Sequence, residues 1–308
     1  MTELLGDRPY VFVTGKGGVG KTTVAAALGL AGAAGGRRTV VCEVGEQRRL
    51  PTLFGVPAGA TGEEIQLAEG LWTVSIDPNS ALREWLARQL GSKGLVQVLS
   101  RSNLFQYFVA AAPGARELVT VTKLWELGQA RRWDRRARPF DLVVADLPAS
   151  GHGIGLLRTA RTFADIARVG PIGSQAGRVA ATIEDRSSTA VVAVALAGEL
   201  PVTETLELEA RATKDLRRGL DAIVANALLP RRWSAADLER LDAADGAVPV
   251  VARRAARAEA GRSRVQQSQL GRLRRHAEAG VVTLPFLATD ALRPADVASL
   301  AEDLRRKL

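Results

Sequence analysis

The chain has 308 residues, is 46% hydrophobic and 24% charged, and carries a formal net charge of +9. This length and balance predict a globular protein with a sizeable core and exclude a disordered or fibrous chain. The single cysteine, Cys42, excludes an internal disulfide and any Cys-x-x-Cys metal site. The chain has no run of roughly 20 apolar residues and no apolar signal-peptide core near residue 1, so we expect a cytoplasmic protein without stable membrane insertion.

A glycine-rich turn lies between an apolar run at residues 10–13 and an alanine- and leucine-rich segment at residues 24–34. The spacing of its glycines satisfies the P-loop pattern, in which backbone N–H groups cradle phosphate oxygens and the following helix adds its positive end. Lys21 is expected to reach the β- and γ-phosphates, and the Thr22 hydroxyl to bind Mg²⁺. The predicted phosphate-binding residues are Gly15, Lys16, Gly17, Gly18, Val19, Gly20, Lys21, Thr22 and Thr23.

Lys16 is a second lysine, placed directly after the first glycine of the turn. An ordinary P-loop does not require it. One interpretation is that Lys16 reaches a nucleotide bound by a second subunit and acts there as an arginine finger does. The alternative is a solvated lysine that only raises the local positive potential.

Short apolar runs alternate with helical segments along the rest of the chain. This alternation predicts an α/β fold, doubly wound around a mostly parallel sheet, with the ligand at the carboxyl ends of the strands. Amphipathic stretches at residues 79–138 predict a helical insertion within a single domain that spans residues 1–308. The predicted strands are residues 10–13, 39–44, 71–76, 140–146, 189–196, 222–226 and 281–284.

Asp146 ends one of these apolar strands, at the position of the Walker B carboxylate of a P-loop protein. There it would hold Mg²⁺ through water, or sense the γ-phosphate. The alternative is a carboxylate that caps a helix or a turn. His152 follows in a stretch of small residues suited to a mobile switch, and it either faces the γ-phosphate or bonds only to its own loop.

Several stretches, taken together and in order, resemble the ArsA/Get3 branch of the "deviant Walker A" ATPases, the arsenical pump-driving or anion-transporting ATPases. This resemblance implies ATP and Mg²⁺ as ligands and a nucleotide-sandwich dimer in which Lys16 acts across the interface. It also implies that Asn226 reads adenine and that Pro285 and Phe286 lie beside the base. The stretches are Lys16–Thr23, Ile76–Leu82, Asp146–His152, Asn226 and Leu284–Leu287.

The first switch departs from the family pattern. Where the family has an aspartate that orients the attacking water, this chain has the stretch Glu43–Arg48. Glu46 is the catalytic candidate that would replace the aspartate, with Glu43 as the other carboxylate in reach. A misplaced carboxylate can cost about 10²-fold in rate, so hydrolysis is expected to be slow or to need a partner. The metalloid-binding and zinc-binding cysteines of the family's best-known members are absent.

Three functions stay open on the sequence. The first is a self-sufficient dimeric ATPase switch whose insertion binds a protein or hydrophobic-helix cargo. The second is a nucleotide-holding subunit that pairs with a paralogue. The third is a positioning ATPase similar to ParA and MinD, prompted by arginine clusters at residues 131–138 and 253–275. We do not expect a nucleic-acid partner, because no aromatic residues interleave the second cluster, and a solvated basic face is the simpler reading.

Overall fold

The computed structural model describes residues 6–45, 48–90, 114–149, 151–167, 170–244 and 248–308. Eight strands form one sheet in the order β3-β4-β2-β5-β1-β6-β7-β8. All neighbouring strands are parallel except β3 and β4, so the predicted α/β fold with a mostly parallel sheet is confirmed. The strands are β1 Tyr10–Gly15, β2 Thr39–Val44, β3 Ile65–Ala68, β4 Leu71–Ile76, β5 Leu142–Asp146, β6 Thr189–Leu196, β7 Ala222–Leu228 and β8 Gly280–Pro285.

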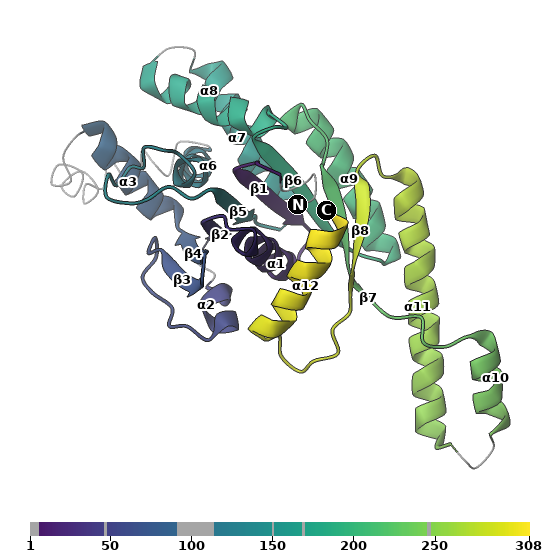
Figure 1. Cartoon of the computed structure of the whole chain (residues 1–308). Helices are drawn as coiled ribbons and strands as arrows, with labels where there is room; N and C mark the ends of the chain where they lie inside the picture. Colours follow the sequence, from purple (N-terminus) through teal and green to yellow (C-terminus); the bar gives the residue numbers. More distant parts are fainter. Residues whose placement is uncertain (1–5, 46–47, 91–113, 150, 168–169, 245–247) are drawn as a thin grey trace.

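Helices cover both faces of this sheet (Figure 1). Neighbouring residues of β1 divide the core between the faces, since Tyr10 and Phe12 lie in one apolar cluster and Val11 and Val13 in the other. The first cluster packs under α6 to α9, and the second under α1 and α12. The helices are α1 Lys21–Ala34, α2 Arg49–Phe54, α3 Pro78–Leu90, α6 Ala115–Leu127, α7 Gly151–Ile166, α8 Gly170–Glu184, α9 Glu199–Leu216, α10 Ala235–Ala243, α11 Val250–His276 and α12 Pro294–Lys307.

Helices α3 and α6 lie between β4 and β5 in the chain, within the segment predicted as a helical insertion. The Tyr10 hydroxyl in β1 donates a 2.6 Å hydrogen bond to the Trp125 carbonyl and so fastens α6 to the sheet. The Trp125 indole N–H donates to Thr182 in α8 at 3.1 Å, so this aromatic side chain belongs to the packing between helices. Three further aromatic residues of the predicted insertion, Phe105, Tyr107 and Phe108, lie outside the described residues.

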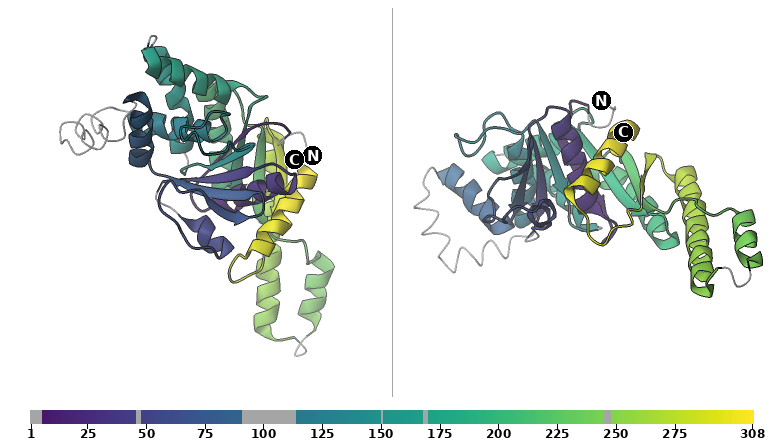
Figure 2. Two further views of the ribbon diagram at one scale, coloured as in Figure 1. Left: turned by 60° about the vertical axis from the view of Figure 1, so that its left-hand side comes forward. Right: turned by 60° about the horizontal axis from the view of Figure 1, so that its bottom comes forward.

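The two arginine clusters have different surroundings. In the segment 131–138, Arg132 is buried and donates to Glu126 and Glu64, so the expectation of a solvated helical face is wrong for this residue. The second cluster lies on α11, which projects with α10 beyond the edge of the sheet (Figure 2). No helix in the described part of the chain is long and apolar enough to cross a membrane.

Candidate functional site

The turn between β1 and α1 requires glycine at two positions. Gly15 has φ +139°, and a Cβ there would lie 2.3 Å from the Val194 carbonyl oxygen. Gly20 has φ +91°, and a Cβ there would lie 2.3 Å from the Asn226 side-chain nitrogen. No described side chain caps the first turn of α1, which begins at Lys21, so its backbone N–H groups stay open to an anion.

Lys21 leads the helix at the mouth of this turn. Its Nζ donates a 2.9 Å hydrogen bond to the Lys16 carbonyl, which folds the side chain back over the turn. Burial lowers the pKa of Lys21, with Arg49 adding to the lowering and the negative charge of Asp146 opposing it. A phosphate bound in the turn would add negative charge beside this ammonium and favour its charged form.

Asp146 meets the turn from the end of β5. The Thr22 hydroxyl donates to Asp146 Oδ2 at 2.6 Å, although the two residues are 124 positions apart. The other oxygen, Oδ1, is buried and has no hydrogen-bond partner among the described residues. Burial raises the pKa of Asp146, against the hydrogen bond from Thr22 and the positive charges of Lys21 and Arg49. A buried carboxylate with one free oxygen beside a hydroxyl is a donor set that suits a hard cation.

Glu43 lies next to Asp146, because the two residues pair in register on the parallel strands β2 and β5. Its carboxylate accepts the backbone N–H groups of Arg49 at 2.8 Å and Leu50 at 3.3 Å, which fixes the start of α2. Burial raises the pKa of Glu43, while those two hydrogen bonds oppose the rise. Glu43 therefore holds the backbone at the start of α2, directly after the first switch, and its oxygens face that backbone.

Asn226 lies two residues before the end of β7, on the other side of the turn. Its side-chain N–H donates to the Val19 carbonyl at 2.9 Å, so the predicted base-reading residue directly contacts the predicted phosphate loop. Pro285 ends the neighbouring strand β8, and the Phe286 N–H donates to the Leu228 carbonyl at 2.8 Å. Both side chains are exposed beside the end of β7, and their role beside a base stays a prediction.

Comparison with known proteins fits this geometry. Residues 8–169 match the family model described as "Anion-transporting ATPase". The chain belongs to this family. It is 33% identical over 256 residues to ATPase BagA of Mycobacterium tuberculosis, an alignment that covers 80% of this chain and 72% of that protein.

Two more distant relatives have names that match the predicted ArsA/Get3 branch. The "Arsenical pump-driving ATPase" of Escherichia coli is 27% identical over 208 residues, covering 67% of this chain and 34% of that protein. "ATPase GET3" of Podospora anserina is 25% identical over 149 residues, covering 48% of this chain and 42% of that protein. The predicted resemblance to ArsA-type ATPases is thus confirmed.

Within this anion-transporting ATPase fold, Lys16 makes an ion pair inside its own chain. Its Nζ lies 2.9 Å from Glu204 Oε1 on α9. The Lys16 side chain is 44% exposed and Glu204 only 23%, so the lysine can leave the pair toward solvent more easily than the glutamate. The predicted action of Lys16 across a dimer interface stays a prediction.

Two other predicted residues are less informative. Glu46, the candidate for the first switch, lies outside the described residues. His152 lies in the first turn of α7 and is exposed, and its role near the γ-phosphate stays a prediction. Asp146 and Thr22, in contrast, lie within hydrogen-bond distance of each other, and their metal-binding role stays a prediction.

Arg49 is a residue of this site that the sequence reading missed. Its positive charge acts on the pKa of Lys21, Glu43 and Asp146, and its own side chain is exposed at the start of α2. The sequence contained a signal for it, since Arg49 follows Arg48 in a pair of arginines at the end of the altered first switch. Arg48 turns away and donates to the Gly59 carbonyl at 2.7 Å.

Proposed function

We propose that this member of the anion-transporting ATPase family is a Mg²⁺-dependent ATP-binding and ATP-hydrolysing switch that works as a dimer and couples nucleotide turnover to a cargo. The observation that carries the proposal is the pairing of Thr22 with Asp146 beside an open glycine turn. The names of the relatives support the ATPase activity.

The described residues fit a magnesium ion. The Thr22 hydroxyl and the free Oδ1 of Asp146 are the oxygen ligands that would hold it, since Mg²⁺ prefers carboxylate and hydroxyl oxygens. When bound, the ion would neutralise charge on the β- and γ-phosphates. Binding would also give Asp146 the positive partner that its buried oxygen lacks.

The remaining residues of the site bind and orient the nucleotide. The N–H groups at the start of α1 would receive the phosphate oxygens, and Lys21 would turn from the Lys16 carbonyl to the phosphates. Asn226 would exchange its hydrogen bond to Val19 for one to adenine. Both exchanges replace an internal hydrogen bond by a ligand bond, so they need little movement of the backbone.

Dimerisation would involve Lys16. Its ion pair with Glu204 is partly exposed to solvent, where such pairs contribute about 0 to 1 kcal/mol. The negative phosphates of a nucleotide in a second subunit would compete for this lysine. ATP would then favour the closed dimer, and loss of the γ-phosphate would favour its opening.

A second candidate function is a nucleotide-holding subunit that pairs with a more active paralogue. The observation that favours it is the use of Glu43 at the start of α2, where its oxygens accept backbone N–H groups. A carboxylate committed in this way is poorly placed to orient a water.

The deciding experiment is steady-state ATP hydrolysis by the purified chain, with molar mass measured with and without Mg²⁺ and ATP. The Lys21→Ala variant, which loses the phosphate-binding ammonium, is the control and should lose turnover and ATP binding. Turnover together with ATP-dependent dimers supports the self-sufficient switch, and tight ATP binding without turnover supports the second candidate. Binding of ATP that Lys21→Ala leaves unchanged would contradict both.

A further inference from the structure

The end of β7 bends out of register directly after Asn226. The pairing of β7 with β8 shifts between Ala225 and Leu228. Ala227, the residue after Asn226, has φ +55°, in the left-handed region that residues other than glycine and asparagine rarely adopt. A bulge with a strained alanine aims the preceding side chain, and it persists only where the surroundings hold it.

One side chain holds both sides of this bulge. Gln266 Oε1 accepts the Leu229 N–H at 2.8 Å, and Gln266 Nε2 donates to the Ala227 carbonyl at 3.2 Å. Gln266 thus bonds to the backbone on both sides of Leu228, where the pairing of β7 with β8 shifts. The residue lies near the middle of α11, 39 positions after Ala227.

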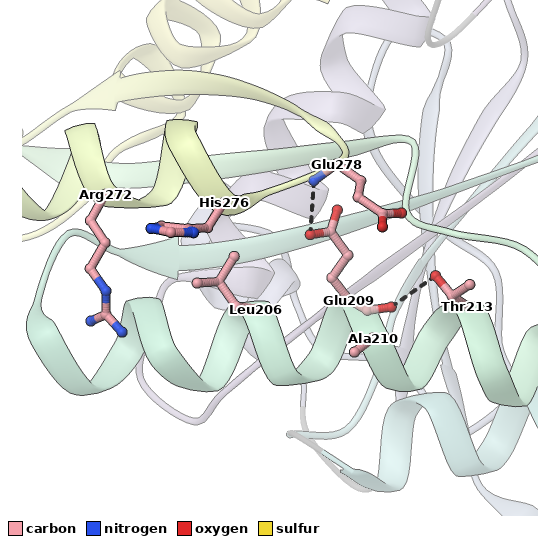
Figure 3. Close-up of a pocket in the computed structure, with 7 residues that line it drawn as sticks. All are labelled: Leu206, Glu209, Ala210, Thr213, Arg272, His276 and Glu278. Carbon is pink, nitrogen blue, oxygen red and sulfur yellow. Dashed lines mark hydrogen bonds between the residues drawn. The ribbon is translucent and has the colours of Figure 1, made fainter.

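Hydrogen bonds connect helix α11 and the residues after it to α9, and they hold the helix that carries Gln266 in place. Arg272 donates to the Thr203 hydroxyl in α9 at 3.1 Å. Beyond the end of α11, the backbone N–H groups of Glu278 and Ala279 donate to the buried carboxylate of Glu209 at 3.1 and 2.8 Å. Figure 3 shows Arg272, Glu209 and Glu278 among the residues that line a hollow between α9 and the end of α11. This hollow has a volume of about 500 Å³.

We propose that Gln266 is a positioning residue for Asn226: by clamping the bulge at Ala227 it sets the direction of the Asn226 amide and thereby the discrimination of the base. The chain of contacts runs from α11 through Gln266 and the bulge to Asn226, whose amide reaches the phosphate loop at Val19. The inference rests on the proposed role of Asn226 in reading adenine. It adds that α11, which projects from the sheet, is connected to the base site.

Gln267 provides a matched control. It is the next residue of α11, has the same side chain, and accepts a 2.7 Å hydrogen bond from Arg231, outside the bulge. A purely structural contribution of a glutamine to the packing of α11 would make the two alanine variants similar. A positioning role predicts that Gln266→Ala changes the ratio of ATP to GTP affinity and that Gln267→Ala does not.

The experiment measures the dissociation constants of ATP and GTP, each with Mg²⁺, for the full chain and four variants: Asn226→Ala, Gln266→Ala, Gln267→Ala and Asn226→Ala with Gln266→Ala. Gln266→Ala should lower the preference for ATP over GTP about tenfold, the weight of one well-placed hydrogen bond, while Gln267→Ala leaves it unchanged. In the Asn226→Ala background, Gln266→Ala should have no further effect on the preference, because Gln266 acts through Asn226.

The outcomes distinguish a failure of the positioning role of Gln266 from a failure of the proposed function. If Asn226→Ala lowers the preference but Gln266→Ala behaves as Gln267→Ala does, the positioning role is wrong and the base role of Asn226 stands. If Gln266→Ala lowers the preference equally with and without Asn226, Gln266 acts by another route and the proposal is overturned. If the unmodified chain binds neither nucleotide, the proposed function itself fails.

Discussion

Two clusters of charged side chains, one at the phosphate loop and one centred on Glu126 in the helical insertion, differ in how their carboxylates are paired. In the insertion cluster, both oxygens of Glu126 accept from cations, Arg132 at 2.8 Å and Lys123 at 3.1 Å. In the loop cluster, Asp146 accepts from Thr22 through one oxygen, and its other oxygen has no partner among the described residues. The insertion cluster comprises Glu64, Glu84, Lys123, Glu126 and Arg132, and the loop cluster comprises Lys21, Thr22, Glu43, Arg49 and Asp146.

The difference shows how a closed charge network can be told from a ligand site. Burial alone acts to lower the pKa of Arg132, but the negative charges of Glu126 and Glu64 outweigh it and raise that pKa. At the loop, burial raises the pKa of Asp146 and lowers that of Lys21, and the nearby opposite charges do not restore either value. Charges that are left partly uncompensated inside a protein are typical of functional sites.

The largest effect is expected from breaking the closed network. Glu126→Gln leaves Arg132 and Lys123 buried without their central carboxylate, and removal of one partner of a buried pair costs about 3 to 5 kcal/mol. Urea denaturation should therefore give a much lower free energy of unfolding for this variant. A loss below about 1 kcal/mol would show that the network is not a stabilising unit.

The corresponding change from carboxylate to amide at the phosphate loop should lower ATP turnover and leave stability intact. Asp146→Asn removes a buried charge, one oxygen of which has no partner among the described residues, so the free energy of unfolding should stay constant or rise. ATP turnover should fall about 10²-fold or more, because the carboxylate charge that is proposed to hold Mg²⁺ is lost. Paired denaturation and turnover assays of Asp146→Asn and Glu126→Gln test this contrast. Equal destabilisation by both variants would contradict it.

The smallest effect is expected at the exposed edge of the loop cluster. Arg49→Ala should weaken ATP binding about fivefold relative to ADP, since an exposed charge contributes about 1 kcal/mol or less. The effect should shrink as salt rises, because exposed charges are screened. Arg48→Ala is the matched control, as its guanidinium bonds to Gly59 and Thr61 instead. Equal ATP affinities for the two variants would remove Arg49 from the site.

Much of the fold followed from the sequence, and its failures have identifiable causes. The parallel strands were predictable because each is a short apolar run bounded by polar residues. The edge strand β3 was not, because it has only four residues, of which only Leu67 is buried, so it gives a weak pattern. Arg132 was misread with its neighbours as solvated, because the carboxylates that bury it come partly from distant positions such as Glu64.

The sequence by itself determined the phosphate loop, since glycine spacing acts locally through allowed backbone angles and through the N–H groups at the start of a helix. It also placed Asp146 at the end of a strand. Only the tertiary structure decided that Asp146 bonds Thr22 through one oxygen and leaves the other open, that Glu43 holds α2, and that Gln266 clamps the bulge beside Asn226. These choices depend on contacts between segments that are far apart in the chain, where the packing of the whole sheet and its helices sets distances that no local pattern encodes.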